Sequence, residues 1–215
     1  EEENVTFEGR FHSFKNVTSL PRPTQQPRPP IWTAALGTEE TVRKAGSNGH
    51  NLMLVPFAGP AMRPVLEAYR EAWKEAGHKG RGIVAMAFHM FCHADRKTAH
   101  DLARPNVKGY FDALAGALEL DAGWGAGTTS SKDYPRYEEH MKKVRETTFD
   151  SMLEAGTMLA GTPDDICQQL SDYIDAAGAF DVTSMQVNFH QITYQQASNS
   201  MRLFSEQVMP HFRDA

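Results

Sequence analysis

Four short apolar runs divide the chain, and each is followed by a segment in which apolar residues recur every three or four positions. The runs cover residues 31–36, 51–55, 83–89 and 182–190. Short continuous apolar runs are typical of strands buried on both faces of a parallel sheet, and the wider spacing is typical of amphipathic helices. The pattern therefore predicts an α/β protein with about four successive βα units.

The segments between the runs carry local signals for the starts and ends of helices. Gly46 is predicted to close a short helix after the first run, and Gly77 to stop the helix after the second. Thr162 is predicted to cap a helix that starts at Pro163, with Asp165 completing a capping box. Longer helices are predicted over 61–76, 95–120, 136–155 and 196–208.

The turn after the first apolar run has the chemistry of an anion site. Gly37 follows the run directly, and Thr38 has the chemistry of a helix N-cap. A helix N-terminus presents unpaired amides and the positive end of a dipole, so a cofactor phosphate fits there, with the hydroxyls of Thr38 and Thr41 as further donors. The two glutamates after Thr38 can satisfy the same dipole, so these residues by themselves favour a purely structural cap.

Composition and charge exclude several classes of partner. The chain has 215 residues and a net charge of −5, and its 22 basic residues form no block, which argues against nucleic acid or an anionic membrane as a partner. No apolar stretch is long enough to span a membrane. Cys92 and Cys167 are a poor disulfide framework, so a reducing cytoplasm is expected. The start at Glu1 rather than Met suggests a piece of a longer protein.

Two further stretches have mainly structural interpretations. The Gly-rich residues 121–135 lack the spacing of a phosphate motif and are predicted to form a loop or insertion. His89, Cys92 and His93 lie close in sequence, but their spacing matches neither a zinc pair nor a haem attachment, so no metal site is predicted.

Polar residues at the ends of the third and fourth runs are candidate pocket residues. They are His89, Asn188 and His190. Barrel enzymes place their chemistry at the carboxyl ends of parallel strands, so we expect these side chains to face one common mouth. The alternative is that they are ordinary structural residues. Hydrolysis through a Ser-His-Asp triad has no support, since no serine lies in a nucleophile elbow.

Five segments, taken in order, resemble the luciferase-like flavin-dependent monooxygenases, which are (β/α)8 barrels of the TIM type. The segments are Phe7-Glu-Gly-Arg-Phe-His-Ser-Phe14, Pro21-Arg-Pro-Thr-Gln-Gln-Pro-Arg-Pro-Pro-Ile-Trp32, Ala34-Ala-Leu-Gly-Thr-Glu-Glu-Thr41 with Ala45-Gly46, Gly161-Thr-Pro-Asp-Asp165 and Phe204-Ser-Glu-Gln-Val-Met-Pro210. Residues 69–77 and 84–91 look most like the branch of the family associated with natural-product biosynthesis.

The resemblance implies that residues 1–215 are the C-terminal half of one barrel domain, with residues 1–30 leading into the fifth barrel strand. Much of the flavin ring pocket then lies in the absent half, so no catalytic residue is assigned and this part by itself is expected to be inactive. What carries over is the seat of the FMN phosphate, which maps onto Gly37, Thr38 and Thr41.

The resemblance also implies a reaction for the complete protein: oxidation of a small organic or carrier-bound acyl substrate by O2 and reduced FMN. Two alternatives stay open. The chain could be a non-catalytic barrel fragment that serves as an interaction or structural module, or part of an oxidoreductase that transfers hydride with a deazaflavin coenzyme. The expected macromolecular partner is the N-terminal half of the barrel or a second copy of this chain, because a half barrel leaves sheet edges open.

Overall fold

The computed structural model describes residues 3–56, 58–125 and 146–213, with the side chains of 118–125 left aside. The chain divides into two compact units, Glu1–Ile31 and Trp32–Ala215. The first unit is an antiparallel hairpin of β1 (Val5–Glu8) and β2 (Ser13–Val17), in which Phe7 and Phe14 pair with ring centroids 5.6 Å apart. The sequence analysis predicted only a lead-in here, because these two strands are exposed throughout and contain no continuous apolar run.

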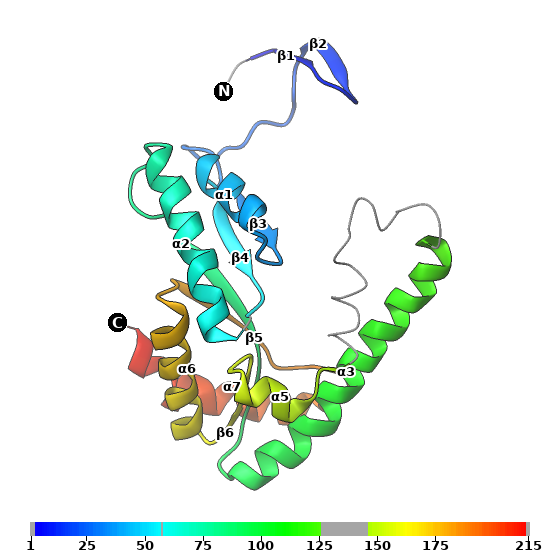
Figure 1. Ribbon diagram of the computed structural model, residues 1–215, viewed down its shortest axis with the longest axis vertical. Helices are drawn as coiled ribbons and strands as arrows, with labels where there is room; N and C mark the ends of the chain where they lie inside the picture. The colour runs from blue at the N-terminus through cyan, green and yellow to red at the C-terminus, as the bar shows by residue number, and fades with distance from the viewer. Residues whose placement is uncertain (1–2, 57, 126–145, 214–215) are drawn as a thin grey trace. The chain divides into compact units, whose positions relative to one another are not determined.

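The second unit is built on a five-stranded sheet in which every pairing is parallel, and this confirms the predicted α/β fold (Figure 1). Its strands are β3 (Trp32–Ala35), β4 (Asn51–Leu54), β5 (Val84–Cys92), β6 (Met158–Gly161) and β7 (Val182–Gln186). Each of the four predicted apolar runs overlaps one of them, with β5 extending three residues beyond its predicted run; β6 was not predicted.

The long strand β5 organises the sheet. Ala85 pairs with both Met53 of β4 and Val182 of β7, so these two strands lie on opposite edges of β5. His89 pairs with both β6 and β7 in the same way. Strands β4 and β6 therefore follow one another along one edge of β5, and β7 occupies the other.

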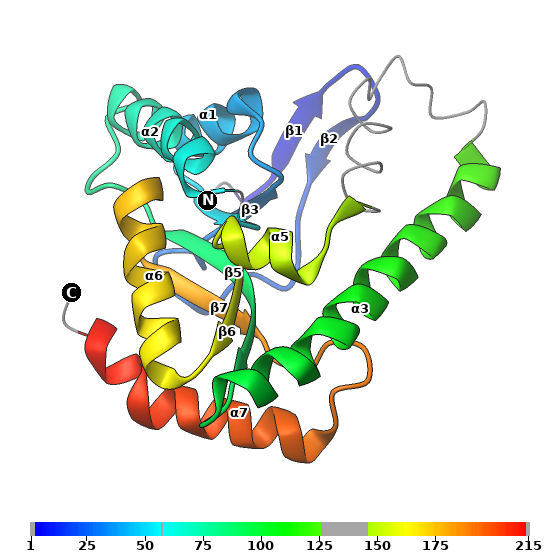
Figure 2. The ribbon, with the colours of Figure 1, turned by 60° about the horizontal axis from the view of Figure 1, so that its bottom comes forward.

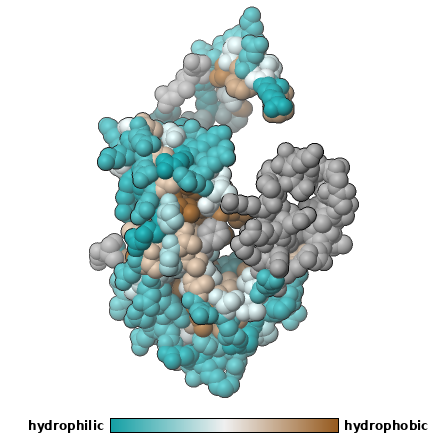
Figure 3. All heavy atoms as spheres, viewed as in Figure 1, coloured by the Kyte–Doolittle hydropathy of each residue, from teal (hydrophilic) through white to brown (hydrophobic). Residues whose placement is uncertain are grey.

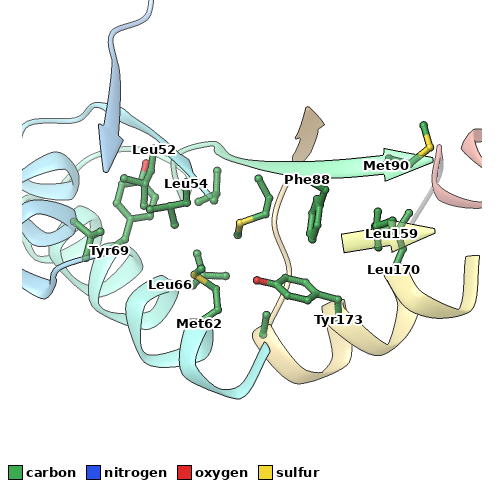
Figure 4. Packing of buried hydrophobic residues seen from close by; sticks show 14 of the residues in the cluster. Leu52, Leu54, Met62, Leu66, Tyr69, Phe88, Met90, Leu159, Leu170 and Tyr173 are labelled. Atoms are coloured by element: carbon green, nitrogen blue, oxygen red, sulfur yellow. The ribbon is translucent and has the colours of Figure 1, made fainter. Parts of the chain in front are cut away.

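Helices cover the sheet unequally (Figure 2). They are α1 (Glu39–Ser47), α2 (Gly59–Glu75), α3 (Arg96–Gly125), α5 (Phe149–Glu154), α6 (Pro163–Ala177) and α7 (Tyr194–Gln207), followed by a 3-10 turn at Met209–Phe212. Helices α1, α2 and α6 pack on one face of the sheet, which we call the covered face. Its core includes Leu52, Leu54, Met86 and Phe88 (Figure 4).

A second, smaller core lies towards the carboxyl end of β5, where α3 and α5 pack against Phe91 and the β6 residues Met158 and Ala160.

We call the side of the sheet to which Trp32 and Met53 belong the open face. In Figure 3 apolar residues are visible in the middle of the viewed surface, between hydrophilic margins.

The boundaries of several helices differ from those predicted. Gly46 lies inside α1, buried against α2, and the helix instead ends before Asn48 and Gly49, which has a φ of 67°. Of the predicted helix over 136–155, residues 136–145 lie outside the described residues; in the rest, Thr147 and Thr148 are not helical, and Thr148 caps the short α5. Helix α3 extends through Gly125, so residues 121–125 of the predicted loop are helical, while 126–135 lie outside the described residues.

Candidate cofactor and pocket residues

The turn between β3 and α1 has the predicted backbone but not the predicted cap. Gly37 has a φ of 86°, which a glycine adopts without the strain of a side chain, and Thr38 stands at the N-cap position of α1. Its hydroxyl does not accept a bond from the first turn of the helix. It donates instead to the Thr41 hydroxyl, with 2.8 Å between the oxygens. The prediction that Thr38 caps α1 by its side chain is therefore wrong.

The other threonine N-caps of the described chain behave differently. Thr148, Thr162 and Thr193 each accept a bond from the amide three residues later, and each belongs to a complete capping box. The predicted box at Thr162 and Asp165 is thereby confirmed. At α1, by contrast, the threonine at the N-cap leaves the amides of the first turn without a side-chain cap.

The first turn of α1 is also acidic, through Glu39 and Glu40. The carboxylate of Glu39 accepts a bond of 2.8 Å from Arg43, and the same guanidinium contacts Glu71 of α2 at 3.0 Å. One of the two acids is thus held by a neighbouring cation along the helix surface. The turn offers amides and hydroxyls as hydrogen-bond donors, which is the donor set that a phosphate accepts from.

His89 lies within β5, three residues before the strand ends at Cys92, and not at a strand end as predicted. Its ring is surrounded by aromatic rings, with centroids 4.8 Å from Tyr110, 5.6 Å from Phe111 and 5.6 Å from Phe189. The Nε2 atom is buried and has no hydrogen-bond partner among the described residues. Burial lowers the pKa of His89 to about 4, so the imidazole is neutral at physiological pH.

Asn188 and His190 do not end the last strand, because β7 stops at Gln186. Both are exposed and lie in the segment that joins β7 to α7. His190 has a φ of 57°, and its ring packs directly on Gly109 of α3, where an added Cβ would lie 2.4 Å from Cε1. The amide of Gln191 then donates to the Asn106 side chain on α3, at 2.8 Å.

The structure therefore brings His89 and His190 to the same turn of α3, at the consecutive residues Gly109 and Tyr110. The sequence analysis missed the aromatic neighbours of His89, namely Tyr110, Phe111 and Phe189. On a predicted helix, the adjacent Tyr110 and Phe111 have the pattern of ordinary core residues. Only the tertiary contacts show that they enclose His89.

The three clustered metal-ligand types do not converge. His89 belongs to the aromatic group against α3, Cys92 lies in the core of the covered face, and the Nδ1 atom of His93 accepts from the Asp95 amide at 3.0 Å. No group of three metal-binding side chains occurs among the described residues. None of the helices in that part of the chain combines the length and apolar character needed to cross a membrane.

Residues 1–179 match the model of the family described as luciferase-like monooxygenase. The chain belongs to the luciferase-like monooxygenase family. The match covers the first four of the five segments and confirms the resemblance, and with it the interpretation of the sheet as part of a TIM-type barrel.

Solved structures agree with this fold. The monooxygenase RslO1 from Streptomyces bottropensis is 28% identical, with a TM-score of 0.71 over 98% of this chain and 56% of its own. The oxygenating constituent of 3,6-diketocamphane monooxygenase from Pseudomonas putida, in complex with FMN, is 18% identical, with a TM-score of 0.65 over 97% of this chain and 58% of its own. An F420-dependent secondary alcohol dehydrogenase is 17% identical, with a TM-score of 0.67 over 100% of this chain and 57% of its own. The chain thus spans somewhat more than half the length of these structures.

Proposed function

We propose that the complete protein is a flavin-dependent monooxygenase that oxidises a small organic or carrier-bound acyl substrate with O2. The observation that carries the proposal is the family match over residues 1–179, and the FMN complex of the diketocamphane enzyme supports the choice of cofactor. Reduced FMN, when bound, supplies the electrons that activate O2 for transfer of one oxygen atom to the substrate.

Gly37, Thr38 and Thr41 are the residues that we propose to hold the FMN phosphate. The positive φ of Gly37 turns the chain into α1, the first-turn amides have no side-chain cap, and the two hydroxyls lie 2.8 Å apart. A phosphate bound there would receive bonds from the amides and from both hydroxyls, with support from the helix dipole. The donor set fits the group.

The pocket at the carboxyl ends of the strands is proposed to be lined, on the side of α3, by His89, Asn188 and His190. A neutral His89 enclosed by three aromatic rings carries no charge that would attract water, so it contributes to a dry wall beside the reacting atoms. His190 and Asn188 are exposed, so a substrate can contact both side chains.

One alternative reaction has a specific observation behind it. The F420-dependent alcohol dehydrogenase matches this chain with a TM-score of 0.67, close to that of the FMN complex. Hydride transfer with a deazaflavin would use the same seat, since both coenzymes carry a phosphate. Consumption of O2 coupled to substrate oxidation separates the two reactions, because hydride transfer requires no O2.

The phosphate seat is tested by replacing Thr38 with Glu in the complete protein and titrating FMN and riboflavin. The added carboxylate repels a phosphate and removes a charge-assisted bond worth about 1.5–3 kcal/mol, so FMN affinity should fall by at least tenfold while riboflavin affinity is unchanged. Ser47→Glu adds the same charge near the other end of α1 and should leave both affinities unaltered. Equal FMN binding by Thr38→Glu and the parent, with the fold intact, would show that the phosphate binds elsewhere.

A further inference from the structure

The open face changes from apolar to polar along β7. Successive side chains of a strand point to opposite faces, so Val182, Ser184 and Gln186 share one face. Their partners in the parallel pairing with β5 are, in the same order, Ala85, Ala87 and His89. Ala85 also pairs with Met53 of β4, so the shared face is the open one. Val182 is apolar, whereas Ser184 and Gln186, nearer the carboxyl end, are polar and exposed.

Asn188 continues this series beyond the end of the strand. Exposure alternates along the segment, since Gln186 and Asn188 are exposed, Val187 between them is half-buried and Phe189 is buried. At about 3.3 Å per residue in an extended chain, successive members of the series lie roughly 6.6 Å apart. We call Ser184, Gln186 and Asn188 the polar row.

The side chains of the polar row have no hydrogen-bond partner among the described residues. The interior of a TIM-type barrel is filled mainly by bulky apolar side chains, and a polar group enclosed there without a partner costs free energy. Three such residues in succession therefore indicate a ligand that supplies the missing bonds. Ala87, beside Ser184, has only a methyl group as its side chain, so the sheet next to the row has room for a flat molecule.

The charge of the ligand follows from the groups around the row. Hydroxyl and carboxamide groups both donate and accept hydrogen bonds, and neither is charged. Strands β3, β4, β5, β6 and β7 contain no Asp, Glu, Lys or Arg. His89, the neighbour of Gln186 across the pairing, is neutral because burial lowers its pKa to about 4. An anionic group would lose its water here without gaining a cation, so these strands favour an uncharged ligand.

We propose that Ser184, Gln186 and Asn188 determine substrate specificity by binding an uncharged, flat molecule through carbonyl or hydroxyl oxygens along one of its edges. Because the row follows one extended segment, it presents its donors and acceptors in a line, which the edge of a ring system matches. The inference rests on the proposed function, since it names the substrate class of the proposed monooxygenase. It adds Ser184 and Gln186 to the pocket residues.

The test titrates the complete protein, without flavin, with three flat quinones and follows their absorbance. Chrysazin carries two hydroxyls beside one carbonyl on the same edge, anthraquinone lacks the hydroxyls, and rhein is chrysazin with an added carboxylate. Chrysazin should bind at least tenfold more tightly than either of the others. Gln186→Leu and Ser184→Ala remove polar groups at similar volume. Each should weaken chrysazin binding at least threefold and leave anthraquinone binding unchanged.

Thr183→Val is the matched control, since it removes a hydroxyl from the same strand on the opposite face. Circular dichroism establishes that the variants keep the fold, and the comparison of the three quinones needs no variant. The proposal is overturned if anthraquinone or rhein binds as tightly as chrysazin. It is also overturned if Gln186→Leu weakens chrysazin binding no more than Thr183→Val does. These titrations involve neither flavin nor O2 consumption, so failure of the polar row and failure of the proposed reaction are distinguishable.

Discussion

The two faces of the central sheet have similar sequences and opposite surroundings. On the covered face Leu52, Leu54 and Met86 are at most 1% exposed, packed under α1, α2 and α6. On the open face Met53, between Leu52 and Leu54 in the same strand, is 42% exposed. Alternate residues of one strand thus belong to a closed core and to a face on which Met53 stays half-exposed.

This difference shows what a continuous apolar run encodes. A strand covered on one face alternates between apolar and polar residues, whereas the Leu-Met-Leu of β4 does not. The run therefore specifies burial on both faces, although the described part of the chain buries this strand fully on only one. We expect substitutions on the covered face to cost folding stability, and substitutions on the open face to cost association instead.

The largest expected contrast lies between Phe88→Ala and Met53→Ala. Phe88 is fully buried and meets Tyr173 edge-on with centroids 5.1 Å apart, so its truncation should cost about 3–5 kcal/mol of unfolding free energy. Met53→Ala removes a half-exposed side chain and should cost less than about 1 kcal/mol. Urea unfolding followed by circular dichroism measures both. Similar losses from the two variants would contradict the division into a covered and an open face.

A second contrast concerns two helical glycines. A Cβ on Gly46 would lie 2.6 Å from the Tyr69 carbonyl oxygen and 2.9 Å from the Trp73 amide, so Gly46→Ala must push α1 away from α2. We expect a loss of about 1–3 kcal/mol, despite the higher helix propensity of alanine. Gly116→Ala on α3 meets nothing within 4 Å and should gain about 0.5–1 kcal/mol. Thermal unfolding of both variants tests the pair, and a stabilising Gly46→Ala would contradict the close contact of the two helices.

A smaller effect is expected from His89 and depends on pH. Burial depresses the pKa of His89 from 6.5 to about 4, so the unfolded chain binds a proton between these pH values and the folded chain does not. Stability should therefore fall on acidification through this window, by at most about 1.4 kcal/mol per pH unit. His89→Phe keeps an aromatic ring between Tyr110 and Phe189 and should remove this part of the pH dependence. An unchanged slope between pH 6.5 and 4 in His89→Phe would show that His89 does not cause it.

Sequence signals were reliable where their cause is local. The capping box at Thr162 and Asp165 involves residues three positions apart, and it was predicted correctly. Thr38 is also a threonine at a helix N-cap, yet its hydroxyl donates to the Thr41 hydroxyl. The rules for helix caps do not predict this bond. Strand β6 was missed because its four residues directly precede that capping box and give no periodic pattern of their own.

The candidate site was predictable only in part, because tertiary contacts determine the burial and protonation of its residues. His89 was selected for its place in an apolar run, but its neutral, enclosed state depends on Tyr110, 21 positions later, and on Phe189, 100 positions later. His190 likewise rests on Gly109. No local pattern connects these positions.

The central claim is that the remaining strands of the barrel bury the open face. Methionine oxidation measured by mass spectrometry tests it most directly. In the chain alone, Met53 at 42% and Met201 at 46% exposure should oxidise at similar rates, while the fully buried Met86 and Met90 react slowly. In a complex with the segment of RslO1 that this chain does not cover, Met53 should become as protected as Met86, and Met201 should stay reactive. Undiminished oxidation of Met53 within a complex shown to have formed would contradict the account.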